Sequence, residues 1–247
     1  MSICKENVKK LIFIQKSKID YWNSFFVWFK KYAMKKEILD SVLYSTLCGE
    51  KIRKLLGIYS ILEEKERKFL SLFSVSCPKC CGECCCHYVP YLSETEANVA
   101  AFLLIKEERE EEALALLNNG DINSPICPLY IEDREKHCFF YEGRSMVCRL
   151  FGGSVALDKN GNPSYRDCKW KENKVVLDPT LLEEDKDSIV IMSNFGEYIE
   201  PEGDPIYISL PRAINQIKLL CSYFNDLPAW QLSRLKAGSF LSRILKN

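Results

Sequence analysis

The sequence lacks several features that would assign it to a common functional class. Its 34 basic and 34 acidic side chains balance, so it has no excess positive charge of the kind that nucleic-acid-binding domains carry. It has no run of about eighteen apolar residues, its first residues do not have the order of a signal peptide, and it has no glycine-rich phosphate loop. We therefore expect a soluble, cytoplasmic protein that binds no nucleic acid and has no transmembrane segment.

Histidine is also scarce, since the chain has only two, His87 and His137. Each lies beside a cysteine, but no third group that would orient a catalytic cysteine–histidine pair is evident. We expect both histidines to lie outside the ligand set of any metal, although either one would serve as a ligand in place of a cysteine. The sequence assigns no catalytic residue, and whether the protein is an enzyme stays open.

Cysteine, by contrast, is abundant, with thirteen in 247 residues. Disulfide frameworks belong mainly to short secreted chains, whereas a chain of this length with 47% apolar residues can bury a core without cross-links. In a reducing cytosol, metal binding explains many thiols better than disulfides do. Ten of the thirteen lie between Cys77 and Cys168.

The first group of cysteines is crowded into residues 77–87, which read Cys-Pro-Lys-Cys-Cys-Gly-Glu-Cys-Cys-Cys-His. Thiolate is a soft anionic ligand for zinc and for iron–sulfur clusters, and a two-residue gap lets two thiolates converge on one centre. This gap occurs in Cys77-Pro-Lys-Cys80 and again in Cys81-Gly-Glu-Cys84. Gly82 has no Cβ, so it suits a turn that brings backbone close to a metal.

The second group consists of four solitary cysteines separated by ten, nine and nineteen residues. One such thiol would be a common core filler, but four, interleaved with turns and following a cysteine-dense loop, indicate a shared site. The predicted metal ligands from both groups are Cys77, Cys80, Cys81, Cys84, Cys85, Cys127, Cys138, Cys148 and Cys168.

The number of metal sites is left open by the spacing. Adjacent side chains point in different directions, so Cys84 and Cys85 fit two sites, or one ligand and one supporting thiol, better than a single ion. Two sites of four thiolates would leave two of the ten cysteines spare, namely Cys86 and either Cys80 or Cys81. Ligand type alone does not separate zinc from an iron–sulfur cluster.

These residues resemble the YkgJ-type cysteine-cluster family, whose domain is described as zinc- or iron-chelating. The family pattern joins Cys-x-x-Cys-x-x-Cys-Cys to later Cys-Pro-Leu, Cys-x-x-Tyr and Arg-Pro-x-x-Cys-Arg segments, and the likeness covers about residues 74–172. The matching segments here are Cys81-Gly-Glu-Cys84-Cys85, Cys127-Pro-Leu129, Cys138-Phe-Phe-Tyr141, Arg144-Ser-Met-Val-Cys148-Arg149 and Cys168. Cys81 is an insertion, so either it or Cys80 is the second ligand, and Ser145 stands where the family has proline.

The resemblance implies metal chelation, and together with the dense thiols it favours an iron–sulfur cluster, such as 4Fe-4S, or iron over zinc. The bound cluster or iron would then serve redox chemistry or metal handling. The alternatives are a structural zinc-binding protein and a protein-modifying enzyme, since some relatives are similar to flagellin lysine N-methylase. Arg144 and Arg149 bracket Cys148, and their positive charges would offset the negative charge of the thiolates.

The pattern of apolar residues predicts helices on both sides of the cysteine region. Spacings of three and four residues occur before residue 72 and again after residue 176. We predict a mostly α-helical, metal-stabilised protein with a small, irregular, β-containing, cysteine-rich core, an α+β arrangement. Its parts are an N-terminal helical region (1–72), a cysteine-cluster metal-binding domain (73–175) and a C-terminal helical region (176–247), and the helical regions offer surfaces for a protein partner.

Local signals add detail to this prediction. Ser93-Glu-Thr-Glu96 has the form of a capping box, followed by a helix-forming run to Leu117. Residues 129–131 and 138–141 are short β-like runs that predict a small hairpin. Pro179 and Pro211 each predict the first turn of a helix.

Overall fold

The computed structural model is mainly helical with little β-structure, which confirms the predicted mostly α fold, while its stabilisation by metal stays a prediction. The structure describes residues 35–72, 81–132, 137–151, 155–157, 159–160, 163–165, 203–228 and 230–235. The helices predicted before residue 35 and around Pro179 lie outside these ranges.

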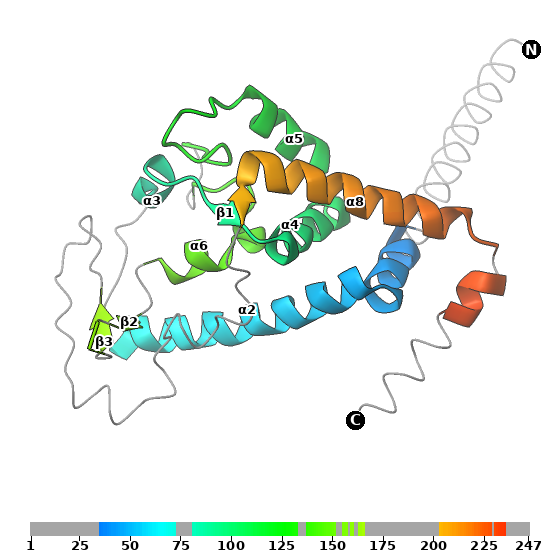
Figure 1. Cartoon of the computed structure of the whole chain (residues 1–247), viewed down its shortest axis with the longest axis horizontal. Coiled ribbons are helices and arrows are strands. Elements are labelled where there is room, and N and C mark those ends of the chain that lie inside the picture. Colours follow the sequence, from blue (N-terminus) through cyan, green and yellow to red (C-terminus); the bar gives the residue numbers. More distant parts are fainter. Residues whose placement is uncertain are drawn as a thin grey trace, which may run out of the picture.

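Three helices form the main layer of the molecule, and α4 lies between the other two (Figure 1). They are α2 (Leu47–Leu72), α4 (Glu94–Lys106) and α8 (Ile206–Asp226), and residues 35–45 form a further helix before α2. Leu62 on α2, Leu104 on α4 and Ile217 on α8 are fully buried, in one apolar core. Burying one such side chain contributes about 1.5–3 kcal/mol, so this shared core is what holds the layer together.

The core joins residues from all three predicted regions, while the boundaries of those regions stay a prediction. None of the described helices is long and apolar enough to cross a membrane.

The start of α4 follows its sequence closely. Ser93 is the N-cap, its side chain accepts from the Glu96 amide, and the Glu96 carboxylate accepts from the Ser93 amide, as in the predicted capping box. The predicted continuation of this helix to Leu117 is wrong, because the chain turns at Glu108, whose φ is 60°. A second helix, α5 (Glu110–Asn119), follows the turn.

The break after α4 is accompanied by a long-range contact of Arg109. The guanidinium donates to the carbonyl oxygen of Phe139 at 2.6 Å and lies 4.3 Å from the centroid of the Phe139 ring. The break therefore coincides with a long-range contact that local helical propensity does not include.

The strands are short and sit at the ends of the helices. Tyr91–Leu92 (β1) pairs antiparallel with Asp204–Pro205 (β4), which brings the starts of α4 and α8 together. Val155–Leu157 (β2) pairs antiparallel with Pro163–Tyr165 (β3). The hairpin predicted from residues 129–131 and 138–141 is reduced to a single antiparallel bridge between Tyr130 and Cys138.

The predicted position of Pro211 in a first helical turn is also wrong. Helix α8 begins at Ile206, whose amide donates to the carbonyl oxygen of Pro90 at 3.0 Å, so Pro211 is an interior residue. Proline has no amide hydrogen, and one intrahelical bond is lost there. The pairing of β1 with β4 fixes the helix start, and that contact lies far away in sequence.

Candidate metal centre

Six of the predicted ligand cysteines line one pocket, with a volume of about 380 Å³. We call it the cysteine pocket, and its cysteines are Cys81, Cys84, Cys85, Cys127, Cys138 and Cys148. They come from three segments of the chain, one with Cys81, Cys84 and Cys85, one with Cys127, and one with Cys138 and Cys148. Their role as ligands stays a prediction, and Cys77, Cys80 and Cys168 lie outside the described residues.

Short-range backbone structure places the first segment. Helix α3 (Glu83–Cys86) is a single turn that carries Cys84 and Cys85. The space that Gly82 leaves open is filled by rings, since a Cβ there would lie 2.8 Å from atoms of His137 and Tyr130. This contact explains why glycine is needed before α3.

Backbone hydrogen bonds connect the three segments around the pocket. The Cys127 amide donates to the carbonyl oxygen of Cys85 at 2.8 Å, and the Phe139 amide donates to that of Leu129 at 2.7 Å. The third segment contains η1 (Tyr141–Gly143) and then α6 (Met146–Leu150), which carries Cys148. The cysteines therefore reach one pocket through turns and bridges rather than through a continuous sheet.

The pocket thiols differ in their tendency to ionise. The Cys85 thiol donates a hydrogen bond to Cys84, which lowers the pKa of Cys84 to about 6 and raises the pKa of Cys85. Burial raises the pKa of Cys127 to about 12 and that of Cys148 to about 11, where the nearby Ser145 hydroxyl acts in the opposite direction. Most of these thiols are therefore protonated near neutral pH, and a metal that bound them would displace protons.

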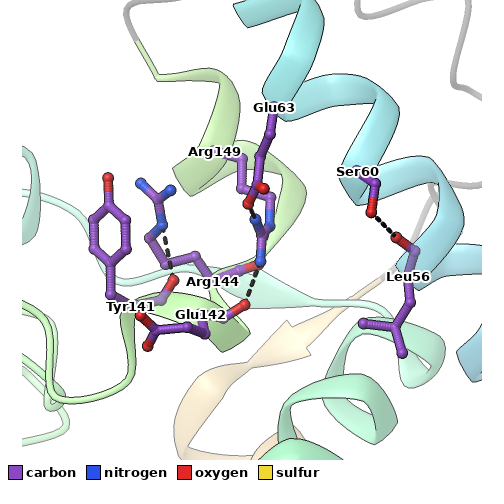
Figure 2. A network of polar contacts seen from close by, with 7 residues as sticks. All are labelled: Leu56, Ser60, Glu63, Tyr141, Glu142, Arg144 and Arg149. Atoms are coloured by element: carbon purple, nitrogen blue, oxygen red, sulfur yellow. Dashed lines mark hydrogen bonds and ion pairs between the residues drawn. The ribbon is translucent and has the colours of Figure 1, made fainter. Parts of the chain in front are cut away.

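Arg144 supplies positive charge to the pocket. It is one of the pocket-lining residues, and its charge favours the thiolate forms of Cys84, Cys138 and Cys148. Its Nε donates to the carbonyl oxygen of Tyr141 at 3.0 Å, and its guanidinium lies 3.4 Å from the centroid of the Tyr141 ring (Figure 2). The expected electrostatic role of this arginine agrees with its position.

Arg149 does something different from what its position beside Cys148 suggests. Its side chain is only 3% exposed, pairs with the Glu63 carboxylate on α2 and lies 4.2 Å from the centroid of the Tyr59 ring. The same guanidinium donates to the carbonyl oxygens of Glu142 and Arg144, the second at 3.0 Å (Figure 2). Arg149 thus fastens the chain around Cys148 to helix α2.

Glu96 is a second buried connector, and sequence reasoning recognised only half of its role. Besides closing the capping box, its Oε1 accepts from the Met146 amide at 2.7 Å, across 50 residues of sequence. The Tyr59 hydroxyl faces the same oxygen at 3.5 Å. Glu96 therefore holds the first turn of α6, and no local motif announces this contact.

The two histidines are not among the residues that line the cysteine pocket in the described part of the chain. His137 is buried, stacks on Tyr130, and its Nδ1 lies 3.2 Å from the carbonyl oxygen of Ile131. His87 is largely exposed beside Glu83, at 3.3 Å. That the histidines lie outside the ligand set stays a prediction.

The donor set of the pocket fits a thiophilic metal, because six sulfurs and one guanidinium share its wall with apolar side chains. Among the described residues, however, no three histidine, cysteine, aspartate or glutamate side chains converge on one point as a metal ion would need. The thiols share a wall rather than forming a closed site.

The chain matches no family model, and comparisons with curated proteins and with solved structures find no match. The resemblance to the cysteine-cluster family therefore rests on the sequence motifs alone and stays a prediction.

Proposed function

We propose that this chain is a metal-binding protein that holds an iron–sulfur cluster, or iron, in the cysteine pocket. The observation that carries the proposal is that six cysteines from three separate segments line one pocket. Thiolates are the usual ligands of iron–sulfur clusters. Such a cluster would supply one-electron redox chemistry.

The size and lining of the pocket favour a cluster over a single zinc ion. In a closed zinc site each sulfur lies about 2.3 Å from the metal, which leaves almost no free volume. The cysteine pocket has a volume of about 380 Å³, and its wall includes Leu129, Phe140 and Ile206. Apolar walls exclude water from a bound cluster and influence its reduction potential.

The chain's own residues would prepare the site for loading. Cys84 is the most acidic of the pocket thiols whose pKa is shifted, so it is the ligand that is ionised before metal arrives. The buried thiols would release protons on binding, and Arg144 would offset part of the negative charge that results. Metal uptake should therefore release protons into weakly buffered solution.

The test is anaerobic reconstitution with iron and sulfide, followed by metal and sulfide analysis and an absorption spectrum. We expect Cys127→Ser and Cys138→Ser to lose at least about tenfold in bound iron, because each removes a pocket ligand. Cys48→Ser and Cys221→Ser are matched controls, since both thiols are partly buried but lie outside the pocket lining. The controls should load like the original protein.

Two results would contradict the proposal. Colourless protein with stoichiometric zinc and no sulfide would exclude the iron–sulfur cluster. Equal loading of the pocket variants and their controls would exclude the pocket as the site.

A structural zinc site is the second candidate, because the three cysteine-bearing segments contain little regular structure of their own. Metal binding would then supply folding free energy to them. Removing zinc with a chelator should loosen residues 81–88 and 127–151, measured by hydrogen exchange, while α4 and α8 stay protected. Uniform loss of protection, or none, would contradict this candidate.

A further inference from the structure

Ser145 is a buried residue of the cysteine pocket that the proposed ligand set does not use. It is only 4% exposed, lines the pocket, and is the N-cap of α6, three residues before Cys148. Its backbone has the extended conformation usual for an N-cap, with φ −63° and ψ 164°. Its side chain is therefore placed where a capping serine would be.

The hydroxyl nevertheless makes no capping bond. A serine at this position normally accepts from an amide in the first turn of its helix, but no such bond forms here. The first amide of α6, that of Met146, donates to the Glu96 carboxylate at 2.7 Å. Among the described residues, the buried Ser145 oxygen has no partner at hydrogen-bonding geometry, although the hydroxyl is close enough to Cys148 to lower the pKa of that thiol.

Such an orphaned hydroxyl is costly, and in native proteins it usually signals a missing partner or a functional role. Other buried serines of the chain are satisfied locally: the Ser41 hydroxyl donates to the carbonyl oxygen of Glu37 at 2.9 Å, and the Ser209 hydroxyl to that of Pro205 at 3.1 Å. Ser145 differs from them because its own helix does not use it. The free donor lies at the wall shared by the pocket thiols.

We propose that the Ser145 hydroxyl donates a hydrogen bond to the Cys148 thiolate, or to a cluster sulfur beside it, when the cysteine pocket is loaded, and so raises the reduction potential of the cluster. This inference rests on the proposed function. A thiolate is a stronger acceptor than a neutral thiol, so the bond strengthens when metal has replaced the proton. One electron added to the cluster makes its sulfurs more negative, so a hydrogen-bond donor stabilises the reduced state more than the oxidised state.

The experiment compares reduction potentials of anaerobically reconstituted proteins in a spectroelectrochemical titration, in which the titrant supplies one electron. Ser145→Ala should lower the equilibrium constant for reduction about tenfold, which is about 59 mV for a one-electron couple. Ser145→Thr keeps a hydroxyl and should stay within about threefold of the original protein. Ser41→Ala removes a buried hydroxyl from the helix at 35–45 and should leave the potential unchanged.

Each outcome separates this inference from the proposed function. An original protein that takes up no cluster overturns both. A fully loaded Ser145→Ala protein with an unchanged potential overturns the inference alone. If Ser145→Ala cannot be loaded while Ser145→Thr can, the inference as stated is overturned, because the hydroxyl is then needed to assemble the site rather than to set its potential. If neither can be loaded, a role specific to the hydroxyl is excluded.

Discussion

The helical layer and the loop that carries Cys138 and Cys148 are ordered by different forces. In α2, α4 and α8 most backbone groups pair within their own helix, and apolar side chains such as Leu104 and Ile217 pack the helices together. Residues 137–151 have only η1 and the single turn of α6. Their backbone groups must therefore find partners elsewhere.

Charged side chains of the loop and of α4 and the turn after it supply some of those partners. Arg109 donates to the carbonyl oxygen of Phe139, Arg149 donates to those of Glu142 and Arg144, and Glu96 accepts from the Met146 amide. Hydrogen bonds that involve an ionised group are stronger than neutral ones. Hydrogen bonds to charged groups thus take the place of a regular backbone pattern in positioning this loop.

The largest effect is expected from a cavity in the helical layer. Leu104→Ala should lower the free energy of unfolding by about 2–5 kcal/mol, because Leu104 is fully buried and its truncation leaves a cavity. Since the variant leaves the pocket intact, its deficit should be the same with and without metal, measured by denaturant melts of both forms. If the loss in unfolding free energy changes with metal, the helical layer and the loop at the cysteine pocket are not stabilised independently.

A buried arginine in the loop should respond differently. Arg149→Met removes the donor to two carbonyl oxygens and the partner of Glu63, and we expect a loss of about 3 kcal/mol. Because this side chain positions the chain around Cys148, metal affinity should fall too, so the deficit should grow when metal is present. Isothermal titration measures the metal affinity, and denaturant melts measure the loss in unfolding free energy.

The control for Arg149 is Arg212→Met. Arg212 pairs with Asp204 at 2.8 Å, but its side chain is 66% exposed, so the change should cost at most about 1 kcal/mol. If both arginines prove equally dispensable, the loop is held by something other than these charges.

A smaller loss is expected at the second connector. Glu96→Gln should cost about 1–2 kcal/mol, because a carboxylate that accepts from the Ser93 and Met146 amides is replaced by an amide with only one acceptor atom. Urea melts measure this loss, and protection of the Met146 amide in hydrogen exchange should fall with it. Glu64→Gln, at an exposed helical pair with Lys68, is the control and should be nearly neutral.

The sequence predicted the features that depend on neighbouring residues. The capping box at Ser93 and Glu96 was recognisable because its partners are three residues apart. The grouping of Cys84 with Cys127 and Cys138 followed from spacing and from the chemistry of thiols, and the structure brings all three to one pocket. Their binding of metal is untested.

The features that escaped prediction depend on contacts between distant residues. The helix break near Glu108 accompanies the contact of Arg109 with Phe139, and the start of α8 depends on the pairing of β1 with β4. Arg149 lies beside Cys148 in sequence, yet its guanidinium fastens the loop to Glu63 on α2. A spacing rule gives the neighbours of a residue along the chain but not the direction of its side chain in the fold.

The smallest effect on stability, and a distinct effect on chemistry, is expected at Arg144. Arg144→Gln should cost about 1 kcal/mol or less, because the side chain is partly exposed and loses one hydrogen bond, to Tyr141. In metal-free protein, hydrogen bonding from Cys85, together with a smaller contribution from the Arg144 charge, lowers the pKa of Cys84 to about 6, so the variant should have a higher pKa at Cys84.

The reactive form of Cys84 is the thiolate, so its alkylation at pH 5 should slow by roughly two- to tenfold in the variant, followed by mass spectrometry of the labelled peptide. Well above the pKa of Cys84 both proteins carry the thiolate, and the difference should vanish by about pH 8. Arg212→Gln removes an exposed arginine outside the pocket lining and should leave the rate unchanged. Equal slowing in both variants would mean that overall charge, and not a guanidinium facing the thiols, sets the reactivity. If only Arg144→Gln slows the reaction at pH 5, the two arginines of this loop have different roles. Arg149 then holds the backbone, and Arg144 lowers the pKa of the Cys84 thiol.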